Sequence, residues 1–465
     1  MITYNLDKTG TESLYEQVCR CIKKDIVEGS LKAGEKLPSK RVLASNLGVS
    51  VITVENAYAQ LMAEGYIYSA PKKGFYVAEF ETLPIKERET MPQQIVVPQK
   101  TEESWYADFS SNQTSSDLFP FTIWSKGIRE ILSDNRVELM KNSPCGGILA
   151  LRENISRYLR DFRGMSVSPE QIIVGAGTEY LYGLLIQLLG NDKVYGVENP
   201  GYRKLEKIYG SYGVPCEWIS MDESGIRVQE LEDKKVDIIH ITPSHQYPTG
   251  IVMPVSRRYE LLGWAAEKEG RYIIEDDYDS ELRLSGQPIP ALQGMDPSDH
   301  IIYMNTFTKT LCSTVRISYM ILPVKLVKQF YVHLSFYSCT VSNFEQYTLS
   351  RFIEEGKFET HVNRLRNHYR KKRDLLLEAL RRSRLKDRVT ISGEEAGLHF
   401  LMNIRTDRSE ENVMEAARQR GIRLVPLSSY YYGKAQDENV YVMNYSSIHM
   451  VEIDEIMERI CQSCE

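Results

Sequence analysis

One lysine of this chain stands among hydroxyl-bearing residues directly after a short apolar segment. Residues 301–304 predict a strand, Lys309 follows between Thr308 and Thr310, and Arg316 lies seven positions further along. A lysine amine can form a Schiff base with an aldehyde, while hydroxyl groups and a guanidinium can hold a phosphate. The run therefore constrains the fold, which must place this lysine after a strand and beside a site suited to a phosphorylated aldehyde.

The region from about residue 106 onward alternates short strands rich in β-branched residues with amphipathic helices. The clearest strands are predicted at residues 172–174, 194–197, 236–241 and 272–274. This alternation predicts an α/β fold with a mostly parallel sheet, whose functional groups gather in loops beyond the carboxyl ends of the strands. The polar motifs of this region all follow predicted strands.

Three loops are candidates for such a site. Residues 175–179, Gly-Ala-Gly-Thr-Glu, precede an apolar helix and could present backbone N–H groups to an anion, although tight strand-to-helix turns also contain glycine for packing. Tyr202 follows a Pro-Gly pair and could lie on a flat ligand or simply end a turn. Residues 245–250, His-Gln-Tyr-Pro-Thr-Gly, form a third loop with polar and aromatic side chains.

A cluster of carboxylates, Glu275-Asp276-Asp277-Tyr278-Asp279, follows the strand predicted at 272–274. Carboxylates at a strand end can bind magnesium, form an acid–base pair, or face a single ring cation. The last arrangement keeps a pyridine nitrogen protonated, and a nearby tyrosine hydroxyl can hold a ring oxygen. Magnesium binding stays open as an alternative at this point.

The first 78 residues predict a small α+β module. Helix-capping patterns begin at Ser13, Ser39 and Ser50, and the second and third helices are joined through residues 46–50 as a helix-turn-helix. Two short strands then flank a Pro-Lys-Lys-Gly turn at 71–74, which predicts a hairpin with two lysines at its tip. A helical module for protein interaction is the alternative to DNA binding.

Charge is distributed unevenly between this module and the rest of the chain. Residues 1–78 hold ten lysines and arginines against eight acidic residues, whereas the 465-residue chain carries a net charge of −6, which leaves −8 for the remainder. A positive head on an acidic body favours local contact with DNA. Residues 79–105, rich in Pro, Gln and charge, predict a flexible linker.

Membrane-span, signal-peptide and cysteine patterns in the sequence predict the cellular compartment of the protein. No apolar run reaches the ~18 residues that span a bilayer, and the N-terminus lacks the pattern of a signal peptide. Eight scattered cysteines do not predict a disulfide scaffold, and the Cys461–Cys464 pair is interpreted as two thiols on a last helix. We expect a cytoplasmic protein without membrane contact.

Residues 12–78 resemble the winged helix-turn-helix domain of the GntR family. The matching residues are Leu37-Pro38-Ser39-Lys40-Arg41, Leu43-Ala44, Leu47-Gly48-Val49-Ser50, Thr53-Val54, Ala57-Tyr58, Leu61, Gly65-Tyr66 and Gly74-Phe75. The order of the glycine turn, Pro-Gly-Tyr, Pro-Thr-Gly, Asp/Tyr and Lys-to-Arg motifs makes residues 106–460 similar to a fold-type I aminotransferase domain. Together they resemble the MocR/GabR subfamily of bacterial transcriptional regulators.

This resemblance implies the cofactor pyridoxal 5'-phosphate (PLP) and a role for each matching residue. Lys309 would form the Schiff base and is the candidate catalytic residue, Asp276 would face the ring nitrogen with Asp277 as the second choice, and Tyr278 would hold the ring oxygen. The full set of cofactor-binding residues is Gly177, Thr178, Glu179, Tyr202, Tyr247, Asp276, Tyr278, Thr306, Thr308, Lys309 and Arg316.

The resemblance also implies binding to a double-stranded DNA operator, with the third helix in the major groove. The expected DNA-binding residues are Ser39, Lys40, Arg41, Ser50, Thr53, Asn56, Lys72 and Lys73. The family commonly has arginine where this chain has Val51, so its base preference should differ. The expected domains are residues 1–78, the linker 79–105, and residues 106–465 for cofactor binding, effector sensing and dimerisation.

Members of the subfamily resemble enzymes but act as regulators, in head-to-tail homodimers. We therefore expect a PLP-dependent regulator that senses an amino compound or PLP itself, with at most partial transamination chemistry. Val442 stands about where aminotransferases carry a carboxylate-binding arginine, so Arg203, Lys204 and Arg423 become candidates for effector binding. A working aminotransferase with a fused head and a DNA-binding protein with a relic scaffold are the alternatives.

Overall fold

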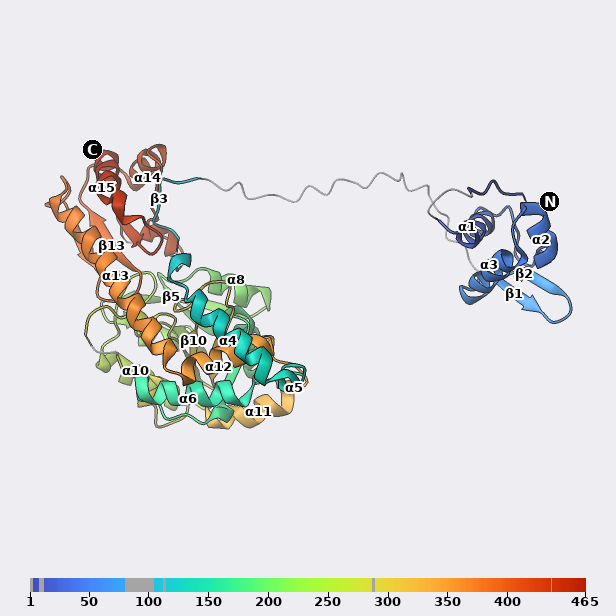
Figure 1. The fold of residues 1–465 in the computed structure, drawn as a ribbon. Helices are drawn as coiled ribbons and strands as arrows, with labels where there is room; N and C mark the ends of the chain where they lie inside the picture. Colours follow the sequence, from blue (N-terminus) through green and yellow to red (C-terminus); the bar gives the residue numbers. More distant parts are fainter. Residues whose placement is uncertain (1–2, 8–11, 80–103, 112–113, 287–288, 436) are drawn as a thin grey trace. The chain divides into compact units, whose positions relative to one another are not determined.

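The computed structural model describes residues 3–7, 12–79, 104–111, 114–286, 289–435 and 437–465. Contacts divide the chain into two units, Met1–Thr101 and Glu102–Glu465 (Figure 1). Most of the predicted linker, residues 80–103, lies outside the described residues. Within the parts that the structure describes, no helix has the length and apolar character needed to cross a lipid bilayer.

The N-terminal unit consists of three helices and a hairpin. Its elements are α1 (Leu14–Val27), α2 (Lys40–Leu47), α3 (Val51–Ala63), β1 (Ile67–Ala70) and β2 (Gly74–Val77). The predicted caps set the helix starts: Ser39 and Ser50 accept hydrogen bonds from the N–H groups of Val42 (3.3 Å) and Thr53 (3.1 Å). The two strands pair antiparallel, with Ile67 opposite Val77.

The core of this unit forms where the apolar stripes of the helices meet. Val18 and Ile22 of α1 pack with Val54 and Leu61 of α3, and all four are fully buried. Val42 of α2 faces outward and is 52% exposed. The burial of its neighbours Leu43 and Ala44 fixes the phase of this short helix and turns Val42 outward.

The larger unit is built on an eight-stranded sheet with the order β4-β11-β10-β9-β8-β5-β6-β7. The strands are β4 (Ile172–Gly175), β5 (Tyr195–Asn199), β6 (Cys216–Asp222), β7 (Gly225–Ile226), β8 (Ile238–Ile241), β9 (Tyr272–Asp276), β10 (Ile301–Thr306) and β11 (Ser318–Ile321). Neighbours from β10 through β9, β8 and β5 to β6 run parallel, while β11 and β7 are antiparallel to theirs. The predicted mostly parallel α/β sheet is confirmed.

Helices cover both faces of this sheet because successive strand residues point in opposite directions. Ile172 and Val174 of β4 pack on one side, in the cluster that includes α6 (Leu149–Arg163), α12 (Asn343–Glu354) and the start of α13 (Lys357–Arg382). Ile173 packs on the other side with α7 (Thr178–Leu189). The remaining helices of the sheet region are α4 (Phe121–Asp134), α5 (Arg136–Leu139), α8 (Lys204–Ser211), α9 (Val228–Asp233), α10 (Val255–Ala266) and α11 (Val324–Leu334).

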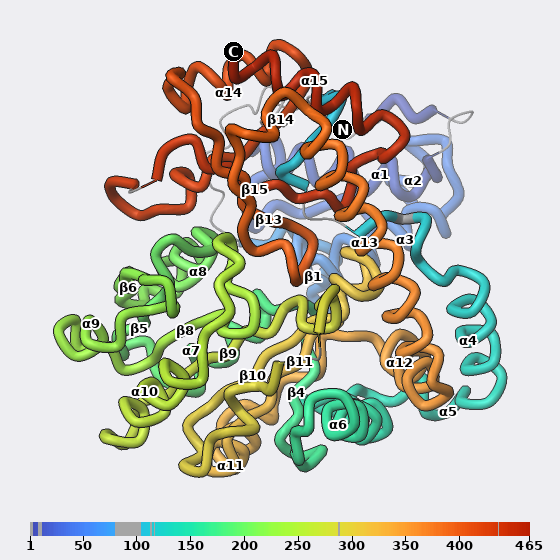
Figure 2. The backbone as a smooth tube through the Cα atoms, turned by 90° about the vertical axis from the view of Figure 1, so that its left-hand side faces the viewer, coloured from blue at the N-terminus to red at the C-terminus, as the bar shows by residue number. Residues whose placement is uncertain are grey.

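The C-terminal residues, together with one short strand from the start of this unit, form a separate small layer. It contains a three-stranded antiparallel sheet, a two-stranded parallel pair and two helices: β12 (Val389–Ser392), β13 (His399–Ile404), β15 (Val440–Asn444), β3 (Ala107–Asp108), β14 (Ile422–Arg423), α14 (Glu410–Gln419) and α15 (Ile453–Cys464). Figure 2 shows β13, β15, α14 and α15 together above the main sheet. The long helix α13 contacts both α12 and α15 and so links this layer to the sheet region.

Candidate functional site

A cavity of about 220 Å³ opens at the carboxyl ends of the parallel strands, where this class of fold places its functional groups. The turn before α7, the end of β9 and the loop after β10 all contribute to its wall. Every residue predicted to bind the cofactor lines it: Gly177, Thr178, Glu179, Tyr202, Tyr247, Asp276, Tyr278, Thr306, Thr308, Lys309 and Arg316. Segments more than a hundred residues apart in sequence therefore meet in one site.

Lys309 lies in the loop that connects the antiparallel strands β10 and β11, three residues after the end of β10. Burial of its amine lowers the pKa of Lys309 to about 8, although the nearby carboxylate of Asp279 acts in the opposite direction. A lysine with a lowered pKa carries more of the neutral amine, which is the form that attacks a carbonyl carbon. The site therefore holds a nucleophile suited to an aldehyde.

One end of the cavity has the character of a phosphate site. Helix α7 begins at Thr178, and the residue before it, Gly177, has a φ of 92°. A Cβ atom at Gly177 would lie 2.4 Å from Nη2 of Arg316, so a larger residue would displace this guanidinium, and the positive φ also favours glycine here. The first N–H groups of α7 and the Arg316 cation thus point to the same place, as anion binding requires.

The hydroxyl groups of Thr306 and Thr308 belong to the same end. They are hydrogen-bonded to each other at 2.8 Å, and Ser318 of β11 donates to Thr306 Oγ1 at 2.8 Å. Glu179 is also here: its carboxylate pairs with Lys204 and lies 3.6 Å from Arg316 Nη2. The hydrogen bond from Lys204 lowers the pKa of Glu179, which keeps this carboxylate charged.

The other end of the cavity is built around Asp276. The hydroxyl of Tyr182 donates to Asp276 Oδ2 at 2.7 Å, and His240 Nε2 lies 3.5 Å from the same oxygen. The second oxygen, Oδ1, is buried without a hydrogen-bond partner among the described residues. A buried carboxylate oxygen of this kind suits the protonated nitrogen of a pyridine ring, so the residues present fit PLP.

Asp277, the second choice for the ring nitrogen, points to the opposite face of the sheet. It forms a 2.6 Å ion pair with Arg163 and accepts a 2.6 Å hydrogen bond from Tyr303, and it does not line the cavity. The alternation of side chains along β9 explains this difference. Ile274 and Asp276 face α7, whereas Glu275 accepts from the backbone of residues 292–293 and Asp277 pairs with Arg163 of α6.

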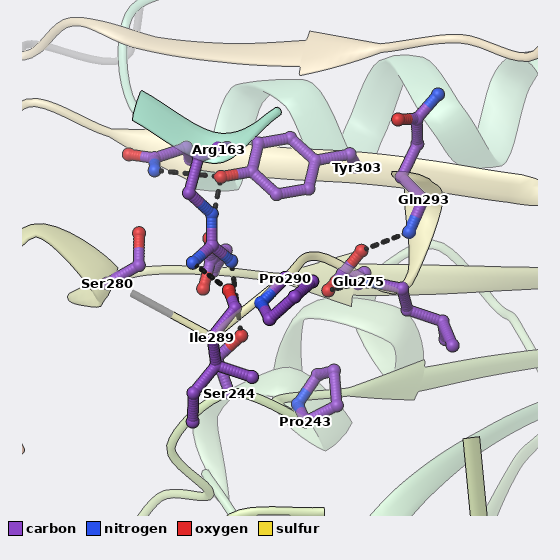
Figure 3. A network of polar contacts seen from close by, with 12 residues as sticks. Arg163, Pro243, Ser244, Glu275, Ser280, Ile289, Pro290, Gln293 and Tyr303 are labelled. Carbon is purple, nitrogen blue, oxygen red and sulfur yellow. Dashed lines mark hydrogen bonds and ion pairs between the residues drawn. The ribbon is translucent and has the colours of Figure 1, made fainter. Parts of the chain in front are cut away.

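Figure 3 shows the network that surrounds this ion pair. Arg163 also donates to the carbonyl of Ile289 and, at 3.3 Å, to Ser244 Oγ, while Glu275 accepts from the N–H groups of Leu292 (2.8 Å) and Gln293 (2.9 Å). Burial, with a contribution from the charge of Asp277, raises the pKa of Glu275 to about 7. The network fixes the end of β9 and thereby the position of Asp276.

Several lining residues were not predicted from the sequence: Tyr182, Val197, Glu198, Leu205, His240 and Thr242. Glu198 accepts a 2.7 Å hydrogen bond from Thr242, and burial raises the pKa of Glu198 to about 7. A histidine inside an otherwise apolar strand was the available signal for His240. Tyr182 carried none, because it lies within an apolar helix.

Aromatic side chains form the remaining wall. The ring of Tyr202 is 46% exposed and lies edge-on to Tyr247, with the centroids 6.1 Å apart. Tyr247 and Tyr430 share a 2.8 Å hydrogen bond between their hydroxyl groups, and Tyr247 is also edge-on to Tyr278 at 6.2 Å. These rings offer flat surfaces to a bound ring.

The residues predicted for effector binding do not line the cavity. Arg203 donates to the carbonyl of Ser429 at 3.5 Å, Lys204 pairs with Glu179, and Arg423 lies 3.5 Å from Asp108. Val442 is buried in β15. Arg316 is the only arginine among the described residues that line the cavity.

The magnesium alternative is not supported by the placement of the carboxylates. Asp276 faces the cavity, Asp277 pairs with Arg163, and Asp279 lies 2.8 Å from His245 Nδ1. In the described part of the chain, no three His, Cys, Asp or Glu side chains are grouped as metal ligands. The carboxylates of Asp276, Asp277 and Asp279 therefore face different partners and do not converge on one cation site.

The predicted DNA-binding residues lie on three segments of the N-terminal unit. Ser39 and Ser50 cap α2 and α3, Lys40 forms a 2.7 Å ion pair with Glu55, and Arg41 and Asn56 are exposed. Thr53 of α3 is half-buried, and Lys72 and Lys73 are exposed at the hairpin tip. Val51 and Ile52 add exposed apolar surface, at 43% and 67%, to the start of α3.

Comparison with known proteins covers nearly the whole chain. Residues 14–77 match the family of bacterial regulatory proteins of the gntR type, and residues 106–460 match the aminotransferase class I and II family. The chain is 40% identical to an uncharacterised HTH-type transcriptional regulator, YdeL, of Bacillus subtilis, over 92% of each chain. It is 31% identical to the pyridoxine biosynthesis regulator PdxR of Corynebacterium glutamicum, over 92% of this chain and 91% of PdxR.

Solved structures share the fold of the larger unit. A kynurenine aminotransferase of Pyrococcus horikoshii superposes with a TM-score of 0.68 at 24% sequence identity, covering 78% of this chain and 91% of the enzyme. At this identity the likeness establishes the arrangement of strands and helices.

Proposed function

We infer the function from the family: this chain belongs to the MocR/GabR subfamily of GntR-family transcriptional regulators, with a DNA-binding head fused to an aminotransferase-like domain. We propose that it binds PLP at Lys309 and that occupancy of the cavity controls operator binding. One observation carries the proposal. A lysine with a pKa near 8 and a buried carboxylate oxygen without a partner line the same cavity.

Each residue has a distinct task in this proposal. The amine of Lys309 would hold the cofactor through its aldehyde, and the first N–H groups of α7 together with Arg316 would bind the phosphate. Asp276 would keep a proton on the ring nitrogen, and the hydroxyl of Tyr278 would hold the ring oxygen. PLP, when bound, supplies an electron sink that reacts with amines.

The signal is proposed to be either an amine that reaches this cavity or PLP itself. The relative PdxR is named for pyridoxine biosynthesis, which supports PLP as a signal. A change in occupancy would shift the larger unit between conformations, and a coupling of ~1–3 kcal/mol suffices to change operator affinity about 5- to 150-fold. We propose that the chain acts as a head-to-tail homodimer, as its subfamily resemblance implies.

A working aminotransferase is the second candidate, since its fold and lysine site are complete. The placement of the arginines argues against it. Arg316 is assigned to the phosphate, and no second arginine among the described residues lines the cavity to bind a substrate carboxylate.

The test combines a spectroscopic and a DNA-binding readout. PLP is titrated into the purified chain and into Lys309→Ala while visible absorbance is recorded, and anisotropy of a labelled duplex selected from a random library reports DNA binding. We expect the absorbance band of PLP to shift in the wild type alone, and a PLP-dependent change of DNA affinity that Lys309→Ala lacks while its basal DNA binding remains. A full response of Lys309→Ala would contradict the proposal, and multiple turnover of amine transfer without DNA binding would support the enzyme.

A further inference from the structure

Glu179 places a negative charge at the end of the cavity that is otherwise built for an anion. It is in the first turn of α7, one residue after Thr178, and its carboxylate lines the cavity. The N–H groups and the partial positive charge of a helix start favour an anion at this place. A phosphate and the Glu179 carboxylate would therefore use the same source of stabilisation.

The two cations nearest to this position are already engaged with Glu179. Lys204 at the start of α8 pairs with Oε1, and Nη2 of Arg316 lies 3.6 Å from Oε2. All three side chains are about half exposed, so they can exchange partners without crossing the protein interior. The Oε2 oxygen thus faces Arg316, the cation that a phosphate would need, while Lys204 holds Oε1 from outside the cavity.

From this arrangement, and on the basis of the proposed function, we propose that Glu179 is an internal competitor of the cofactor phosphate. PLP can load only when Arg316 exchanges Glu179 for the phosphate, while Lys204 keeps hold of the displaced carboxylate. Part of the phosphate affinity is lost in this exchange, because two anions then share one helix start and two cations. The consequence is a site whose occupancy follows the PLP concentration, as a sensor of PLP requires.

The role of Lys204 follows from the same geometry. As long as it holds Oε1, the Glu179 carboxylate is drawn toward α8 and away from Arg316. Removal of the lysine would leave Arg316 as the nearest remaining cation for Glu179. Substitutions at the two positions should therefore change PLP affinity in opposite directions.

The experiment compares PLP with pyridoxal, which has the same ring and aldehyde but no phosphate. Dissociation constants of both compounds are measured from visible absorbance for the wild type, Glu179→Gln, Lys204→Met and Glu206→Gln. Glu206 lies on α8 and does not line the cavity, so its substitution removes one nearby charge outside the site.

We expect Glu179→Gln to bind PLP about five- to tenfold more tightly, the size of one charge–charge contact at a half-exposed site, with pyridoxal affinity changed less than twofold. Lys204→Met should bind PLP more weakly than the wild type, and Glu206→Gln should match the wild type. Unchanged PLP affinity in Glu179→Gln, or an equal gain for pyridoxal, would overturn the competitor role. If the wild type binds no PLP at all, the proposed function itself fails.

Discussion

The hydroxyl of Tyr182 donates a 2.7 Å hydrogen bond to Oδ2 of Asp276 and so turns the other oxygen, Oδ1, into the available acceptor of this carboxylate. A hydrogen bond to a charged group contributes ~1.5–3 kcal/mol, so Asp276→Asn should weaken PLP binding about ten- to hundredfold. Tyr182→Phe keeps the carboxylate and should weaken binding less. A titration followed by absorbance measures both, and wild-type affinity in Asp276→Asn would refute the assignment.

The lowered pKa of Lys309 predicts how fast the lysine reacts at different pH values. Only the neutral amine attacks an aldehyde, so the rate of PLP attachment should rise as the pH increases through about 8 and level off above it. Stopped-flow absorbance between pH 6.5 and 9.5 measures this rate. A rate that still rises steeply at the upper end would show an ordinary lysine.

Lys372 provides an internal control for this reaction. Burial lowers the pKa of Lys372 to about 8 as well, but its amine donates to the carbonyl of Ser446 at 2.8 Å and does not line the cavity. After borohydride reduction, peptide mass spectrometry should find the phosphopyridoxyl group on Lys309 and show Lys372 unmodified. Equal labelling would mean that basicity alone, rather than the cavity, selects the lysine.

The buried ion pair between Arg163 and Asp277 predicts a large loss of stability when it is broken. Asp277→Asn leaves a guanidinium without its counter-ion among buried groups, which typically costs ~3–5 kcal/mol. All four tryptophans, Trp105, Trp124, Trp218 and Trp264, belong to the larger unit, so their fluorescence during denaturant unfolding reports on it alone.

The matched control for that variant is an exposed ion pair of the same helix. Asp161 lies 3.5 Å from Arg160, and both side chains are more than half exposed. Asp161→Asn should change the free energy of unfolding by about 0.5 kcal/mol or less. Similar losses in the two variants would mean that the network around Asp277 does not stabilise the end of β9.

The lysines at the hairpin tip predict a salt-dependent contribution to DNA binding. If Lys72 and Lys73 each contact one phosphate, Lys72→Ala and Lys73→Ala should each reduce the slope of log affinity against log salt by ~0.9 and weaken binding to all sequences alike. Lys24→Ala, on the exposed surface of α1 beside Glu28, serves as the control. Anisotropy titrations at several salt concentrations measure the slope, and unchanged slopes would exclude the hairpin from the interface.

Much of the fold and the cavity could be predicted because the signals are local. A capping serine marks the start of each of the second and third helices, and each motif of the larger unit follows a strand whose end points to one edge of the sheet. Asp276 rather than Asp277 faces the cavity because β9 continues to Asp276, two residues beyond its predicted end, in strict alternation. Local patterns did not reveal His240 or Tyr182, since their role depends on side chains that other elements bring to them.

The pairing of Thr306 with Ser318 closes the segment that carries both Lys309 and Arg316. Lys309 and Arg316 are thus carried by one loop of fixed length, whose two ends are held together by the antiparallel strands β10 and β11. Inserting or deleting one residue between Lys309 and Arg316 would change the spacing between the Schiff-base lysine and the phosphate-binding guanidinium.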